Sequence, residues 1–122
     1  MEIRCNDHLT LLRQMHPFWL AVTIWFHELK ALDFPRLKSI QKYNKKTAED
    51  TISKLMRLDG FTEDEIVKTL NLSFYDTFWS KNLYSVCACR DKTKNGLSKF
   101  ENIYNKLPQE SEQNEAPYEQ LG

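Results

Sequence analysis

Hydrophobic residues recur at helical spacing directly after Pro17. Apolar side chains occupy positions i, i+3, i+4, i+7, i+11 and i+14, and these are Phe18, Ala21, Val22, Trp25, Leu29 and Leu32. Such spacing places the whole set on one face of an α-helix. Pro17 suits the first turn of a helix, because the amide hydrogen that it lacks would have no partner there. The pattern predicts a helix that begins at residue 17 and turns this stripe toward the core.

Two shorter helices are predicted on either side of this one. Asp7 has the short acidic side chain that caps a helix start, which predicts a helix over residues 7–16. Pro35 is expected to begin a short helix that turns Leu37 and Ile40 inward. The chain from residue 7 to residue 40 is therefore expected to be helical almost throughout.

The middle of the chain contains the sharpest helix boundaries. Thr47 is a candidate cap for one helix, and Gly60 is its expected stop, because glycine adopts the left-handed conformation that ends helices. Thr62 and Glu65 then match a capping box, in which each side chain accepts a hydrogen bond from the other residue's amide. The capping box predicts that another helix begins at residue 62.

Aromatic and capping residues organise the last third of the chain. Residues 73–76 are expected to turn the backbone, so that Phe78 and Trp79 plug the core. Ser85 is a plausible cap for a short helix over 86–90. A turn at Asn95-Gly96 precedes a final helix over 99–107, which Ser98 caps and Pro108 stops.

The fold class follows from these signals together. The chain has only three glycines and no alternating β-branched run bounded by turns. We therefore expect an all-α fold, with one compact multi-helix domain over residues 1–108. Residues 109–122 are polar and acidic, and they are expected to form a disordered tail.

Charge is distributed unevenly along the chain. All 17 lysine and arginine residues precede Pro108, and the four glutamates beyond it are Glu110, Glu112, Glu115 and Glu119. The first 108 residues therefore carry 17 basic and 13 acidic side chains. A modest positive excess fits a polyanion-binding surface and fits an ordinary solvated surface about as well.

Two basic patches are the candidate nucleic-acid contacts. The first patch contains Arg36, Lys38, Lys42, Tyr43, Lys45 and Lys46, without an acidic residue among them. The second contains Lys81, Arg90, Lys92, Lys94 and Lys99, opposed only by Asp91, and Asn82 lies within the same stretch. Of these, Asn82, Arg90, Lys92 and Lys94 are the predicted contacts. The cations would neutralise phosphates, while Tyr43 and Asn82 would stack or hydrogen-bond. The alternative for both patches is a solvated face without a ligand.

The sequence supports neither catalysis nor a cofactor or metal. It contains no phosphate-binding glycine loop and no Gly-x-Ser-x-Gly nucleophile motif. Cys87 and Cys89 are one residue apart, whereas the paired cysteines of structural zinc sites are separated by two to four residues. The longest apolar run, residues 17–26, is about half the length that spans a bilayer. Free cysteines without a signal peptide then favour a cytoplasmic protein with no membrane contact.

A longer pattern resembles a known family. The chain reads Arg57-x-Asp59-Gly60-Phe61-Thr62-x-Asp64-Glu65-Ile66, then Asp76-x-Phe78-Trp79-x-x-Asn82-x-x-Ser85, then Arg90 and a basic segment up to Phe100. This pattern resembles the C-terminal module of phage and prophage replication initiator and helicase-loader proteins, and the similar part covers residues 57–107. The resemblance implies a DNA-replication accessory protein of a phage or mobile element. Its expected partners are DNA, single-stranded in the first instance, and a replicative helicase. The alternative is an inhibitor or regulator that binds a protein and never contacts nucleic acid.

Overall fold

Helix α2 (Phe18–Asp33) lies at the centre of the structure, a computed structural model described over residues 2–40 and 42–108. It contacts α1, α3 and α4 as well as two of the short 3₁₀ turns. Trp25 and Phe26 are fully buried on it, and Trp25 Nε1 donates a hydrogen bond to the Arg4 carbonyl at 2.7 Å. The middle of the stripe predicted after Pro17, namely Ala21, Val22, Trp25 and Leu29, is buried and belongs to the core.

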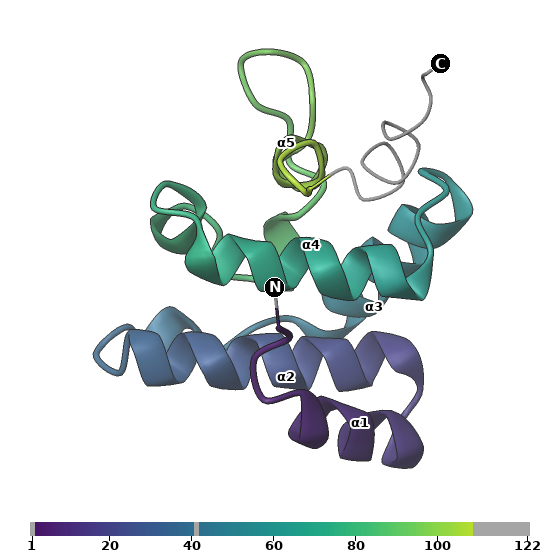
Figure 1. Ribbon diagram of the computed structural model, residues 1–122, viewed down its shortest axis with the longest axis vertical. Helices are drawn as coiled ribbons and strands as arrows, with labels where there is room; N and C mark the ends of the chain where they lie inside the picture. Colours follow the sequence, from purple (N-terminus) through teal and green to yellow (C-terminus); the bar gives the residue numbers. More distant parts are fainter. Residues whose placement is uncertain (1, 41, 109–122) are drawn as a thin grey trace, which may run out of the picture.

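The other helices stack around α2 in layers (Figure 1). Helix α1 (Asn6–Met15) lies on one side of α2, and α4 (Glu63–Tyr75) lies along its other side with α5 (Lys99–Tyr104) beyond it. Helix α3 (Lys45–Arg57) packs against α2 as well. The 3₁₀ turns are η1 (Lys38–Ile40), η2 (Trp79–Lys81) and η3 (Val86–Ala88). In the described part of the chain the only strand-like pairing is an isolated bridge between Lys92 and Ser98. The prediction of a compact all-α domain is confirmed, while the predicted tail, 109–122, lies outside the described residues.

Local capping signals predicted several helix starts correctly. The Thr62–Glu65 capping box is formed, with Glu65 N donating to Thr62 Oγ1 at 3.1 Å and Thr62 N donating to Glu65 Oε1 at 2.9 Å. Ser98 caps α5, and its bonds with Glu101 make a second capping box. Ser85 Oγ accepts from the Cys87 amide at the start of η3.

Two predicted caps are wrong. Helix α1 begins at Asn6 rather than Asp7, after Cys5, and no side chain caps it. Helix α3 begins at Lys45, because Asn44 Oδ1 accepts from the Thr47 amide at 2.9 Å. Thr47 is thus the residue that donates to the cap. It stands three positions after Asn44, where a capped helix presents its free amide.

Several predicted helix lengths also differ from the structure. The helix expected after Pro35 is only the single turn η1, and the one expected over 86–90 is only η3. Helix α4 continues through the turn predicted at 73–76 and ends at Tyr75, and α5 ends at Tyr104 rather than at residue 107. The termini of these helices depend on hydrogen bonds across the whole domain, and local sequence patterns predict them only approximately.

Three side chains predicted to be buried are exposed. Leu32, Leu37 and Phe78 have exposed fractions of 71%, 41% and 55%. Leu32 belongs to the last turn of α2, and Figure 1 shows that α1 lies against only the N-terminal part of that helix. Trp79 is buried, as predicted, at 7% exposure. Adjacent side chains in a tight turn point in different directions, so Phe78 and Trp79 do not both reach the core.

Candidate nucleic-acid interface

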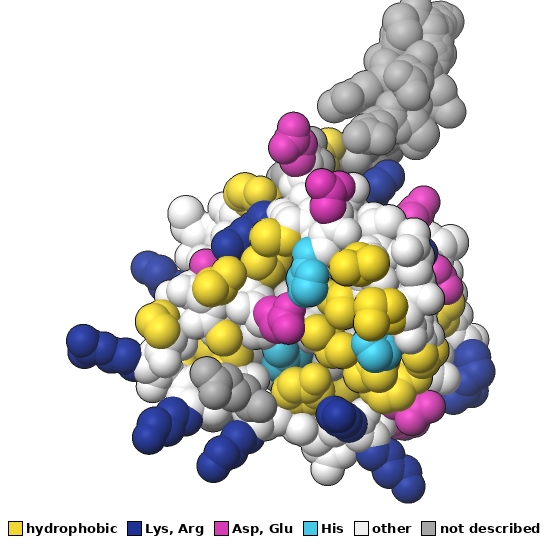
Figure 2. Space-filling view, turned by 90° about the horizontal axis from the view of Figure 1, so that it is seen from below, with side chains coloured by type: hydrophobic (Ala, Val, Ile, Leu, Met, Phe, Trp, Pro, Cys, Tyr) yellow, Lys and Arg dark blue, Asp and Glu magenta, His cyan; other side chains and the backbone are white. Residues whose placement is uncertain are grey.

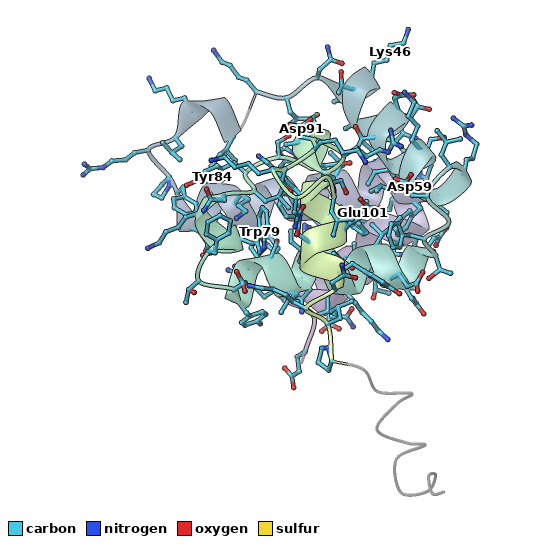
Figure 3. All side chains as sticks on the ribbon, turned by 90° about the horizontal axis from the view of Figure 1, so that it is seen from above. Lys46, Asp59, Trp79, Tyr84, Asp91 and Glu101 are labelled. Atoms are coloured by element: carbon cyan, nitrogen blue, oxygen red, sulfur yellow. The ribbon has the colours of Figure 1, made fainter. Side chains whose placement is uncertain are left out.

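The first basic patch lies along one edge of the molecule. It follows the connection from α2 to α3, and we call the exposed residues Arg36, Lys38, Lys42, Lys45 and Lys46 the basic edge. None of these five takes part in an ion pair within the described ranges. Figure 3 shows this connection running along the rim of the molecule, with long side chains pointing away from it and Lys46 at one end. The charges are therefore presented to solvent without an ion pair to a described acidic side chain.

Buried hydrogen bonds hold the backbone of the basic edge in place. His27 is 5% exposed, and its Nδ1 lies 3.1 Å from the Ile40 carbonyl oxygen. The Val86 amide donates to His27 Nε2 at 3.2 Å. Because an amide can only donate, Nε2 is the acceptor and Nδ1 carries the proton that it gives to Ile40. Burial lowers the pKa of His27, which keeps the ring neutral, against a smaller opposing effect of the Ile40 bond.

Tyr43, in the first patch, packs against the core of the fold. Its ring stacks on His27 with centroids 4.0 Å apart and an interplanar angle of 29°. The side chain is half-buried, and burial raises its pKa. One ring face is therefore occupied, so the stacking role predicted for Tyr43 is restricted to the other face.

The second patch is split between an exposed hairpin and a fixed ion pair. Lys92 and Lys94 are exposed on the hairpin that the Lys92–Ser98 bridge closes. Arg90 instead forms a two-pronged ion pair with Asp59, with Nε to Oδ2 at 2.9 Å and a second bond to Oδ1 at 3.1 Å. Hydrogen bonding to Arg90 lowers the pKa of Asp59. The guanidinium of Arg90 therefore binds within the fold rather than presenting an isolated charge.

Asn82 also has a local partner. Its side-chain nitrogen donates to the Phe78 carbonyl at 2.7 Å, and its own carbonyl accepts from Lys99 Nζ at 3.4 Å. The residue is exposed, so its amide oxygen faces solvent while its amide nitrogen closes the turn. Asn82 thus shapes the segment between η2 and η3.

The segments that carry the two patches meet where η3 packs against α3. The Cys87 thiol donates to the Asn44 carbonyl at 3.6 Å, which places η3 against the start of α3 and the end of the basic edge. Lys92 and Lys94 lie on the hairpin that follows η3. Figure 1 shows this hairpin beside α5, away from the layer of α2 and of the connection that carries the basic edge.

One buried lysine near these patches was not expected from the sequence. Lys30 is fully buried at the end of α2, and its ammonium donates to the Ser80 carbonyl at 2.9 Å. Its Nζ lies 5.1–5.6 Å from four aromatic ring centroids, those of Phe26, Phe34, Phe74 and Tyr84. Burial lowers the pKa of Lys30 to about 8. The local sequence does not reveal this burial, because the aromatic residues that surround Lys30 lie up to 54 positions away.

The described residues offer little to a metal or a membrane. No group of three or more histidine, cysteine or acidic side chains among them could hold a metal ion. Cys5 is exposed and Cys89 is buried, and burial raises the pKa of the Cys89 thiol. A small polar pocket lies between Arg90, Lys92, Ser98 and the acidic pair Asp59 and Glu101. No helix described here has both the length and the apolar character needed to cross a membrane.

An apolar surface remains exposed on the face formed by α1 and α2. Leu11 and Met15 on α1 are 53% and 65% exposed. Figure 2 shows hydrophobic side chains gathered around histidine and acidic side chains on the face formed by α1 and α2. His8 and Glu28 are paired between these helices, with Nε2 and Oε1 2.6 Å apart. We call Leu11, Met15 and this pair the α1–α2 face.

Comparisons of the chain with protein-family models, with curated proteins and with solved structures found no match.

Proposed function

We propose that the protein is a small replication accessory protein of the phage or mobile-element kind that binds single-stranded DNA. The basic edge, together with Lys92 and Lys94, would contact the phosphates. A replicative helicase is the protein partner that accompanies this proposal. The family resemblance of residues 57–107 motivates the role in replication, and the charge distribution motivates the DNA.

The observation that carries the proposal is the run of exposed cations in the basic edge, with two more exposed cations on the hairpin. The five cations of the basic edge, and Lys92 and Lys94 on the hairpin, form no salt bridge to any described residue. Clustered cations gain affinity for a polyanion by releasing the counterions bound to its phosphates. By contrast, five other basic residues form ion pairs with acidic side chains, and these are Arg4, Arg13, Lys54, Arg90 and Lys106.

The shape of the basic surface favours a single strand over a duplex. Its cations lie mainly on a connecting segment and a hairpin rather than along an exposed helix that would enter a major groove. Such a surface neutralises a flexible backbone without reading base edges. We therefore expect little preference for base sequence.

Fluorescence anisotropy with a labelled oligothymidine tests the proposal directly. The wild type should bind at low salt and weaken as salt rises, with each phosphate contact contributing about −0.7 to the log–log slope. Lys38→Gln combined with Lys42→Gln should weaken binding and flatten this slope. Arg57→Gln combined with Lys68→Gln removes two exposed cations elsewhere on α3 and α4, and it should change little. Absence of binding at low salt would remove the DNA hypothesis.

A second candidate function rests on the α1–α2 face. The exposure of Leu11 and Met15 suits an inhibitor or regulator that binds a protein, since exposed apolar patches commonly mark interaction sites. Leu11→Ser combined with Met15→Ser separates the two functions. These changes should leave affinity for single-stranded DNA intact if the basic surface is the functional one.

A further inference from the structure

Phe78 is a large aromatic side chain that the fold leaves exposed to solvent. It is 55% exposed although its neighbour Trp79 is buried. Asp76 Oδ2 accepts from the Phe78 amide at 3.0 Å and from the Trp79 amide at 2.8 Å. The Phe78 carbonyl accepts from Asn82 Nδ2 at 2.7 Å. Its backbone is thus fixed on both sides, and the exposure is built into the turn.

The ring also keeps a surface on which another ring could lie. Phe78 and Trp79 meet nearly perpendicularly, with centroids 4.8 Å apart and an interplanar angle of 88°. A perpendicular contact covers at most one face of the Phe78 ring, and the exposed fraction shows that much of the remainder is open.

The surroundings of Phe78 are positively charged. Lys81 is exposed three residues further on, and Lys99 Nζ reaches the Asn82 carbonyl at 3.4 Å. The nearby carboxylate of Asp76 is paired with Lys106 at 2.7 Å. An occupant with both a flat apolar ring and a negative charge would complement this site.

The Phe78 turn also adjoins the basic edge. Tyr84 contacts Phe34 edge-on with centroids 5.1 Å apart, and Phe34 directly follows α2, two positions before Arg36. Lys30 holds the same turn to α2 through the Ser80 carbonyl. Figure 3 shows Tyr84 between the basic edge and Trp79. A strand bound along the basic edge would therefore continue onto the turn that carries Phe78.

We propose that Phe78 is a stacking platform for an unpaired base, with Lys81 and Lys99 contacting the phosphates on either side of that base. The inference rests on the proposed function and adds to it the recognition of a base. Aromatic stacking of this kind is tolerant of sequence, because every base has a π-face.

The experiment compares two strands of equal length, an oligothymidine and an abasic strand with the same phosphates. Phe78→Ala should weaken binding of the oligothymidine by roughly tenfold, the scale of one lost base–aromatic stack. Binding of the abasic strand should not change. Phe78→Trp should keep the wild-type affinity, and its fluorescence should be quenched by the oligothymidine. Leu11→Ala, which truncates a side chain of similar exposure on α1, is the matched control.

The outcomes separate this inference from the proposed function. Equal affinity of wild type and Phe78→Ala for the oligothymidine overturns the stacking role alone, and leaves Phe78 available to a protein partner. Equal losses on both strands also overturn it, because phosphate contacts rather than stacking would then depend on the ring. A wild type that binds neither strand overturns the proposed function itself.

Discussion

Burial of the Lys30 ammonium costs free energy, yet the side chain links several parts of the fold. Removing an ammonium from water costs several kcal/mol unless new interactions offset the loss. Here the Ser80 carbonyl and four aromatic rings face the charge, and each cation–π contact contributes about 0.5–2 kcal/mol. The lowered pKa indicates that these contacts offset the desolvation only in part. Lys30 therefore connects α2 to the turn of Phe78, although burial destabilises its charged form.

Stability should consequently increase at alkaline pH because of Lys30. Its pKa falls from 10.5 to about 8 in the folded protein, so the unfolded chain binds the extra proton between these values. Over that window the free energy of unfolding should rise with pH by about 3 kcal/mol. Urea denaturation at pH 7.5 and pH 10 measures the change. Lys30→Met should lack this component, and an equal pH response in both proteins would contradict the assignment.

Trp79 and Phe78 should respond oppositely to truncation although they are adjacent. Trp79→Ala should destabilise the fold by about 3–5 kcal/mol, as expected for a large buried aromatic residue. Phe78→Ala should cost much less, since more than half of that side chain is already in water. Thermal unfolding of both variants makes the comparison. An unchanged melting temperature for Trp79→Ala would place the indole at the surface.

At the scale of elements, His27 joins three segments that are distant in sequence. It belongs to α2, donates to the backbone of η1 and accepts from the first residue of η3. Protonation of Nε2 would convert this acceptor into a donor that faces the Val86 amide. The Tyr43 ring stacks beside it, and no acidic side chain is bonded to the imidazole among the described contacts. The neutral ring is thus required where the basic edge meets η3.

The fold should therefore lose stability as the pH falls below about 6.5. The pKa of His27 is lowered in the folded state, so the unfolded chain binds the proton first and is favoured on acidification. Melting temperatures between pH 7.5 and pH 5 should show the decline. His27→Gln removes this titration, whereas His8→Gln, at an exposed position, should retain it. Equal acid sensitivity of wild type and His27→Gln would contradict this origin.

The elements also show what the sequence could predict and why. The Thr62–Glu65 capping box was predictable because all its atoms lie within four residues. The ion pair of Arg90 with Asp59 joins residues 31 positions apart, and the bond of Lys30 to Ser80 joins residues 50 apart. Such partners are set by the packing of helices, which no local pattern encodes. For the same reason the sequence shows the run of cations in the basic edge but could not show that Arg90 is paired with Asp59.

At the scale of the whole molecule, the basic edge stands out as a run of cations with no acidic residue between them in sequence. Within residues 2–108 most acidic side chains are paired or cap helices, while the basic edge remains open. The α1–α2 face is apolar by comparison and points away from the layer of α4 and α5 (Figures 1 and 2). The molecule therefore presents two chemically distinct surfaces, suited to a polyanion and to a protein.

The acidic segment after Pro108 should weaken DNA binding by competing for the basic surface. Its four glutamates are Glu110, Glu112, Glu115 and Glu119. A tethered ligand acts at high effective concentration, so even a weak attraction to the basic edge would occupy part of it. Removal of residues 109–122 should tighten binding to single-stranded DNA severalfold, most at low salt where screening is weak. The melting temperature should remain nearly unchanged, as expected for a segment with almost no apolar anchor.

Neutralising the four glutamates in the full-length chain distinguishes charge from length. Replacing each of them with glutamine keeps the segment but removes its negative charge, so it should tighten DNA binding as much as the truncation does. The difference from wild type should vanish in high salt for both variants. If truncation lowers the melting temperature by several degrees while the glutamine variant does not, the segment contributes to the fold through Tyr118 or Leu121. Contacts of those apolar side chains, rather than competition by charge, would then explain the effect of the segment.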